Sequence, residues 1–230
     1  MNYLILYSAD NTKGKKDATG AFIPEAKKLE IYLLEQGADF EYGNENSVDM
    51  VPIQTKGRSL KDRRDQVESV LKERRTLDHV YFLCHGYKHG IQFGYKWRSG
   101  AVKLANVLNR NSSITPNVTF YCCSVAKDRD NFAKWMFDEL SCLDVLRNGV
   151  QVFGHYTAGH TTMNPCIKIY ATGYKPFILS NNTPKGYNQL ITTGKDEARK
   201  RMRDSSDDLR FSIPFYVETM RDNGYDWGWS

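Results

Sequence analysis

The sequence predicts an α/β fold: a three-layer α/β/α sandwich with a mainly parallel central sheet. Short apolar runs rich in β-branched and aromatic residues recur along the chain, and such runs are typical of strands buried on both faces. They lie at 3–8, 80–84, 118–121 and 150–157. Segments with helical spacing of apolar residues lie between these runs, as the crossover connections of a parallel sheet require.

The first expected strand, 3–8, is followed by a helix that begins at Pro24 and Glu25 and ends before Gly37. Proline favours the first turn of a helix, and glycine favours the position just after its end. The expected buried stripe of this helix consists of Ala26, Leu29 and Leu33. A weaker extended segment is expected around 40–53.

Ser59 and Asp62 match a capping box, which predicts a helix that starts there and runs to about Arg75. Closely spaced glycines in 87–97 predict a tight hairpin, and apolar residues at helical spacing predict a helix over about 101–109. The remaining expectations are a helix over 132–143 capped by Asp128 or Asp130, a strand at 167–170, and an edge strand or docking segment at 209–217.

Two neighbouring strands of this plan end in side chains that can carry chemistry. The strand 80–84 stops at His85 and Gly86, and the strand 118–121 stops at Cys122 and Cys123. Because ligands bind beyond the carboxyl ends of parallel strands, a histidine and a cysteine are expected side by side at that edge. A thiol nucleophile and its general base need this arrangement.

The expected chemistry is attack by a thiolate on a carbonyl group. An ordinary thiol has a pKa of about 8.5, so His85 would serve to ionise Cys123 and later to protonate the leaving amine. Backbone N–H groups of Gly86 and Cys123 are candidates for stabilising the oxyanion. No cofactor is implied by such a dyad.

Cys122 and Cys123 compete for the role of nucleophile. Side chains alternate between the two faces of a strand, so only one of the two thiols is expected to point to the site, and Cys123 is the favoured one. Cys84, Cys142 and Cys166 are expected to be packing residues, because cysteine is among the most buried residue types.

The motif His85-Gly86, three further residues, then Gly90-Ile91-x-Phe93-Gly94 resembles the catalytic His-Gly and following hairpin of caspases. The resemblance implies the caspase-like fold of the gingipain, legumain, metacaspase and separase group, with His85 as base, Cys123 as nucleophile and Gly86 as oxyanion donor. Caspases have Gln-Ala before the nucleophile and Arg-Gly after it, whereas this chain has Tyr121-Cys122 and Ser124-Val125. This difference argues against the aspartate preference of true caspases.

Substrate contacts are expected from three places. Cys122 occupies the position of the small residue before the nucleophile. The segment 154–165, in which the strand 150–157 ends, contributes His155, Thr157 and His160. The corresponding region helps to bind substrate in the caspase-like group, and an ordinary polar turn explains the segment equally well. Asp10 lies past the first strand, and metacaspase-like and gingipain-like relatives use acidic pockets for lysine or arginine, which suggests a weak preference for basic residues. A lone aspartate is more often a turn former.

Composition excludes several other classes. The 230 residues are 40% hydrophobic and 26% charged, which fits one globular domain over 1–230, with a core over about 1–180 and an extension over about 181–230. The net charge of +5 is spread among many acids, so no nucleic-acid partner is expected, and no apolar run is long enough for a membrane span.

The spacing of His85 and His89 is that of a metal pair on a helix, but the glycines beside them argue against a helix, and no metal is expected. Five cysteines without paired spacing indicate reduced thiols in the cytoplasm.

The sequence therefore predicts a cysteine endopeptidase that acts on a protein or peptide substrate. The alternative is an inactive caspase-like scaffold that binds a regulatory protein partner. A flavodoxin-like binding module is the third possibility, but no glycine-rich phosphate loop follows the first strand.

Overall fold

A computed structural model describes residues 1–9, 22–38, 46–111, 114–144, 149–157 and 166–178. These residues form a seven-stranded sheet and a separate two-stranded hairpin. In spatial order the sheet contains β2 (Ser47–Ile53), β1 (Asn2–Ser8), β3 (His79–Leu83), β6 (Asn117–Tyr121), β7 (Gln151–His155), β8 (Ile167–Ala171) and β9 (Phe177–Ile178). The first five strands pair in parallel, and β8 and β9 are antiparallel additions. The expected mainly parallel sheet is confirmed.

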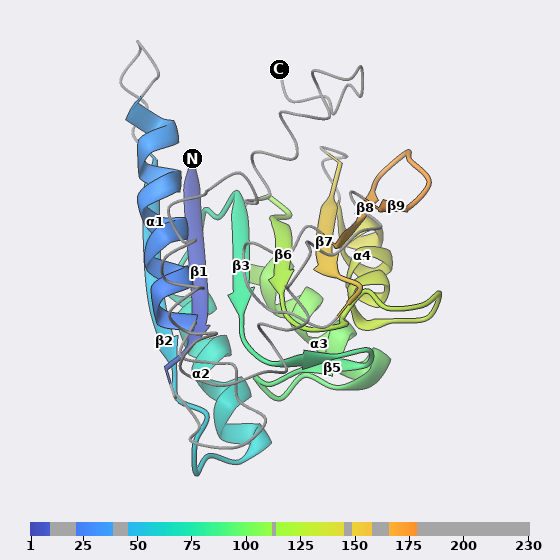
Figure 1. The fold of residues 1–230 in the computed structure, drawn as a ribbon, viewed down its shortest axis with the longest axis horizontal. Coiled ribbons are helices and arrows are strands. Elements are labelled where there is room, and N and C mark those ends of the chain that lie inside the picture. The colour runs from blue at the N-terminus through green and yellow to red at the C-terminus, as the bar shows by residue number, and fades with distance from the viewer. Residues whose placement is uncertain (10–21, 39–45, 112–113, 145–148, 158–165, 179–230) are drawn as a thin grey trace, which may run out of the picture.

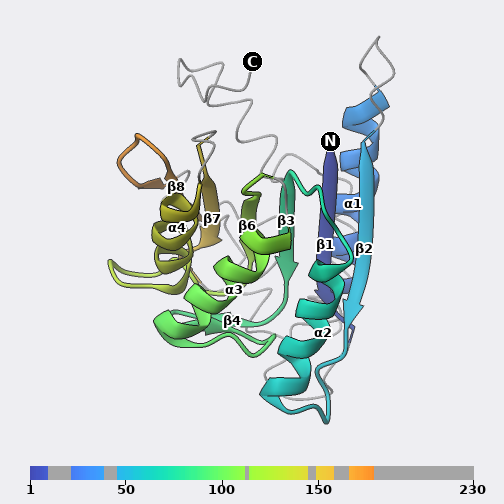
Figure 2. The same cartoon turned by 180° about the vertical axis from the view of Figure 1, so that it is seen from behind.

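Helices cover both faces of this sheet, as the three-layer prediction requires. The helices are α1 (Phe22–Ala38), α2 (Leu60–Lys72), α3 (Trp97–Asn111) and α4 (Phe132–Leu143). Figure 1 shows α1 in front of the sheet, and Figure 2, seen from behind, shows α2, α3 and α4 on the other face. The arrowheads of β1, β3 and β6 point to one edge, along which lies the hairpin of β4 (Gly86–Tyr87) and β5 (Gly90–Ile91) (Figure 1).

The alternation of side chains along the strands builds two cores. Leu4, Phe82 and Phe120 pack with apolar residues of α2, α3 and α4. Tyr81 and Tyr121, which alternate with them, pack with the buried stripe of α1 on the opposite face, where Ala26, Leu29 and Leu33 are buried as expected. Burial of each such large apolar side chain contributes roughly 1.5–3 kcal/mol to the free energy of unfolding. Packing on both faces therefore stabilises the sheet.

The N-terminal caps of α2 and α4 were both predicted from the sequence, and one of the two predictions is confirmed. Ser59 and Asp62 form the expected capping box: the Asp62 N–H donates to Ser59 Oγ over 3.1 Å, and the Ser59 N–H donates to Asp62 Oδ2 over 3.0 Å. The predicted cap of α4 was wrong. Asn131 is the cap, and its Oδ1 accepts from the Lys134 N–H over 2.9 Å, while Asp130 instead accepts from the indole N–H of Trp135 over 2.7 Å.

Several boundaries differ from the sequence interpretation. The extended segment becomes the regular strand β2, and α1 and α3 each begin earlier than expected, at Phe22 and Trp97. The predicted strand 209–217 and the extension 181–230 lie outside the described residues. No helix within the described part of the chain combines the length and apolar character needed to cross a membrane.

His79, at the start of β3, gives a testable pH dependence. It is buried, its Nε2 lies 2.7 Å from Thr119 Oγ1, and burial lowers its pKa from 6.5 to about 3. Between these values the unfolded chain binds a proton that the folded chain does not, so the free energy of unfolding falls as the pH falls below 6.5. By pH 5 this residue should lower it by about 2 kcal/mol. Urea denaturation at pH 5 and 7.5 should show a smaller pH effect for His79→Gln than for the wild type; equal pH effects would contradict this account.

Candidate active site

The loop that carries His85 is held in place by the hairpin that follows it. The His85 N–H donates to Gln92 Oε1 over 3.1 Å, and the Gln92 N–H donates back to the His85 carbonyl over 2.8 Å. The His85 ring lies edge-on to Phe22, with ring centroids 5.2 Å apart, so it faces the side of the sheet that α1 covers. Hairpin and helix together fix where the imidazole can lie.

Gln92 also links the ends of three strands, a role that sequence inspection missed. Its Nε2 donates to Thr55 Oγ1 over 3.0 Å, and Thr55 Oγ1 lies 3.3 Å from Ser8 Oγ. Ser8 ends β1, and Thr55 follows β2. This chain of hydrogen bonds ties the His85 loop to the carboxyl edge of the sheet. A polar residue between the apolar Ile91 and Phe93 was the only sequence signal for it.

The two adjacent cysteines have different environments. Cys122 is fully buried, and its Sγ lies 3.5 Å from Cys84 Sγ and 3.3 Å from the Phe82 carbonyl oxygen. Burial is the main cause that raises the pKa of the Cys122 thiol well above its usual value, and the hydrogen bond with Cys84 raises it further. The raised pKa disfavours a thiolate at Cys122. Cys123 is partly exposed. Of the two thiols, Cys123 is the one suited to be a nucleophile.

The expectation that Cys122 contacts substrate was wrong for its side chain. Alternation from Tyr121 directs Cys122 into the core under α2, α3 and α4. Cys123 lies in the turn that follows β6. His85 lies just beyond β3, the strand that pairs with β6. The candidate base and nucleophile therefore lie at the same carboxyl edge of the sheet, beyond two paired strands.

The turn that holds Cys123 is anchored to the end of β7. Ser124 adopts φ 57°, a left-handed conformation that is uncommon for a residue with a side chain. Its N–H donates to the Thr157 carbonyl over 2.9 Å, and the Ala126 N–H donates to the His155 carbonyl over 3.0 Å. Backbone strain of this kind is often found at functional sites, where the surrounding contacts stabilise it.

The histidine and cysteine turns touch each other at Gly86. A Cβ atom placed on Gly86 would lie 2.6 Å from Cys122 Cβ, 2.8 Å from Val125 Cγ1 and 2.9 Å from the Cys123 carbonyl oxygen. These separations leave no room for any side chain at position 86. The absence of a Cβ lets the backbones of the two turns meet, which places His85 and Cys123 on adjoining turns.

The other predicted site residues fall into two groups. His155 is buried at the end of β7, with its ring centroid 5.7 Å from that of Tyr121, and Thr157 supplies the carbonyl that binds Ser124, so both lie beside the cysteine turn. Asp10 and His160 lie outside the described residues. Their expected contacts with substrate stay predictions.

The other three cysteines and His89 lie outside the candidate dyad. Cys84 and Cys166 are buried as expected, but Cys142 is exposed on α4, so its predicted packing role was wrong. His89 stacks between Trp97 and Trp135, with ring centroids 4.8 Å and 5.5 Å away. Its environment is aromatic, which gives it a packing role in the hairpin.

No protein-family model, curated protein or solved structure matches this chain. The α/β architecture with a mostly parallel central sheet is compatible with a caspase-like fold.

Proposed function

We propose that this protein is a cysteine endopeptidase of the caspase-like group, acting on protein or peptide substrates through Cys123 and His85. The observation that supports this most strongly is the contact between the two turns. Gly86, directly after His85, packs against Cys122 and the Cys123 carbonyl at the carboxyl edge of a parallel sheet. Sites of open α/β sheets lie at this edge, and a thiol beside an imidazole is the minimum machinery for acyl transfer.

In the proposed reaction His85 takes the proton of the Cys123 thiol, and the thiolate attacks the carbonyl carbon of the scissile peptide bond. Backbone N–H groups of Gly86 and Cys123 stabilise the oxyanion. The imidazolium then protonates the leaving amine as the C–N bond breaks, which leaves a thioester on Cys123. Water, deprotonated by His85, hydrolyses the thioester and regenerates the thiol.

The surroundings of the dyad fit this role. The His85 backbone is fixed by the hydrogen bonds with Gln92, and the cysteine turn is fixed by its hydrogen bonds to β7. Preorganised groups of this kind are what acyl transfer requires, because the reacting atoms must be held close and oriented. A preference for basic residues at the cleavage position is the part of the proposal that depends on Asp10, and the thiol chemistry is consistent with a reducing compartment such as the cytoplasm.

Alkylation separates the enzyme from a scaffold of the same fold. Cys142 is exposed on α4 and serves as the reference thiol within the same chain. With iodoacetamide at pH 7, Cys123 should be modified at least about tenfold faster than Cys142, because an imidazole neighbour raises the thiolate fraction. Cys84 and Cys122 should react far more slowly because they are buried. Site-resolved mass spectrometry measures all of these rates in one sample.

His85→Asn is the matched variant for this test. It should bring the rate at Cys123 down to that of Cys142 while leaving the Cys142 rate unchanged. If Cys123 in the wild type reacts no faster than Cys142, the protein has no activated thiol, and the scaffold alternative replaces the peptidase.

A further inference from the structure

A cavity lies on the α4 side of the sheet, beyond the cysteine turn. It has a volume of about 410 Å³ and is lined by the segment that leads into α4, by β8 and by the residues around β9. Three of its lining residues are cationic, Arg129, Lys134 and Lys168. Tyr156, Tyr170 and Ile178 supply apolar surface. Small-molecule sites commonly combine these features: an apolar wall, a few convergent charges and a volume of about 300–1,000 Å³.

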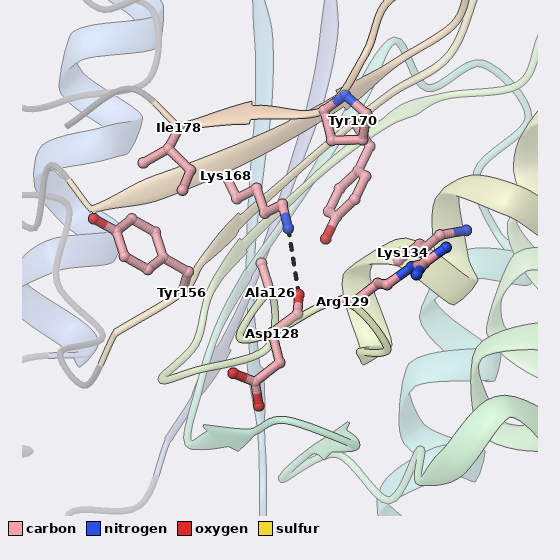
Figure 3. Close-up of a pocket in the computed structure, with 9 residues that line it drawn as sticks. Ala126, Asp128, Arg129, Lys134, Tyr156, Lys168, Tyr170 and Ile178 are labelled. Carbon is pink, nitrogen blue, oxygen red and sulfur yellow. Dashed lines mark hydrogen bonds between the residues drawn. The ribbon is translucent and has the colours of Figure 1, made fainter. Parts of the chain in front are cut away.

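Lys168 is the central cation of this cavity. Its ammonium lies 3.3 Å from the Asp128 carbonyl oxygen and 5.4 Å from the centre of the Tyr170 ring. Figure 3 shows the ammonium directed at this carbonyl, with the Asp128 carboxylate turned away from it. That carboxylate lies 3.2 Å from the ammonium of Lys88 instead. Burial lowers the pKa of Lys168, and an anion bound beside the ammonium would favour its charged form.

The other two cations, Arg129 and Lys134, line the same cavity as Tyr170 (Figure 3). Lys134 pairs with Asp138 over 2.6 Å. Within the described part of the chain neither Arg129 nor Lys168 has a carboxylate within 4.0 Å. The two are therefore available to bind an anion.

The frame of the cavity is rigid. Asn131 donates from Nδ2 to the Asp128 carbonyl over 3.0 Å and to the Tyr170 hydroxyl over 2.8 Å, and it also caps α4. The same Asp128 carbonyl accepts from Lys168. Asp128 adopts φ 63°, so the segment holds an uncommon backbone conformation that directs this carbonyl into the cavity. The start of α4 adds the partial positive charge of a helix N-terminus.

We propose that this cavity is a binding site for a small organic anion, with a phosphate or carboxylate group between Lys168 and Arg129 and a planar apolar body against Tyr156 and Ile178. The charge pattern selects the anionic group, because charge-assisted hydrogen bonds from two cations favour phosphate and carboxylate oxygens. The volume of about 410 Å³ fits a small molecule. This site does not depend on the dyad, so its test requires no peptidase activity.

Calorimetric titration of the full chain with three probes tests the proposal. Phenyl phosphate and benzoate carry the two candidate anionic groups on the same planar body, and benzyl alcohol is the neutral match. At least one anion should bind saturably at one site, at least about tenfold more tightly than benzyl alcohol. Whichever anion binds more tightly identifies the group that the site prefers.

Lys168→Met keeps most of the apolar stem and removes the charge. It should weaken binding of the preferred anion at least about tenfold. Arg129→Gln, at an exposed position that tolerates the change, should weaken it about threefold or more. Lys72→Gln, an exposed residue on α2, is the control and should leave the affinity unchanged. Thermal unfolding without probe checks that each variant is folded.

Two results would overturn the proposal. One is the absence of saturable binding by either anion up to about 10 mM, which is weaker than a built site of this size provides. The other is an equal affinity for benzyl alcohol, or an equal loss of affinity in Lys72→Gln and Lys168→Met. Either would show that the cations do not form a site.

Discussion

Replacing His85 by asparagine should lower kcat/KM for peptide cleavage by about a thousandfold. The change removes both the base that ionises Cys123 and the acid that protonates the leaving amine, and general acid–base catalysis contributes about 10²–10⁴-fold. Asparagine has a similar size, so the loop that Gln92 holds through the backbone of residue 85 should be retained. Steady-state kinetics on a cleaved peptide, with circular dichroism as a check of folding, measures the effect.

His89→Asn is the matched control, because this histidine lies on the same hairpin but stacks between Trp97 and Trp135. It should change stability modestly through the lost stacking and leave kcat/KM within about threefold of the wild type. A comparable loss of activity in both variants would indicate that the hairpin fold, and not the imidazole of His85, determines the rate.

Gly86→Ala should destabilise the protein by about 3 kcal/mol and remove its activity. The added methyl group would lie 2.6 Å from Cys122 Cβ and 2.9 Å from the Cys123 carbonyl oxygen, and neither is the flexible end of a long side chain. The two turns must therefore separate, which moves His85 away from Cys123. Urea denaturation measures the stability, and activity should be lost even at temperatures where the variant is folded.

The same substitution at Gly57 provides the comparison. Gly57 has φ +67°, and a Cβ there meets no atom within 4 Å, so the cost of alanine is limited to the left-handed backbone, roughly 1 kcal/mol. Activity should be unchanged. If Gly86→Ala is as mild as Gly57→Ala, the close contact between the histidine and cysteine turns does not exist in solution.

The parts of the fold that the sequence predicts are those set by local pattern. Short apolar runs identify the buried strands, and the capping box at Ser59 identifies the start of α2, because each signal acts within a few residues. The choice of Cys123 over Cys122 also rests on a local rule, the alternation of side chains along a strand. The burial of Cys122 agrees with that choice.

Features that depend on distant partners were missed. Gln92 acts through Thr55 and the His85 backbone, and no pattern near it indicates either partner. The sequence predicts Asp128 or Asp130 as the cap of α4. Asp130 instead accepts a hydrogen bond from the indole of Trp135, and the neighbouring Asn131 caps the helix. The cationic cavity joins residues about 40 positions apart, from Asp128 to Lys168, so only the folded sheet shows it.

Cleavage of a peptide library by the wild type, Cys123→Ala and Cys122→Ala tests the central claim most directly. The proposed dyad predicts cleavage by the wild type, cleavage by Cys122→Ala with somewhat lower stability from the lost core contact, and none by Cys123→Ala. Mass spectrometry of the products identifies the cleaved bonds, and a basic residue before them would support the role of Asp10. Loss of activity only in Cys122→Ala, or equal cleavage by the wild type and Cys123→Ala, would contradict the assignment of Cys123 as the nucleophile.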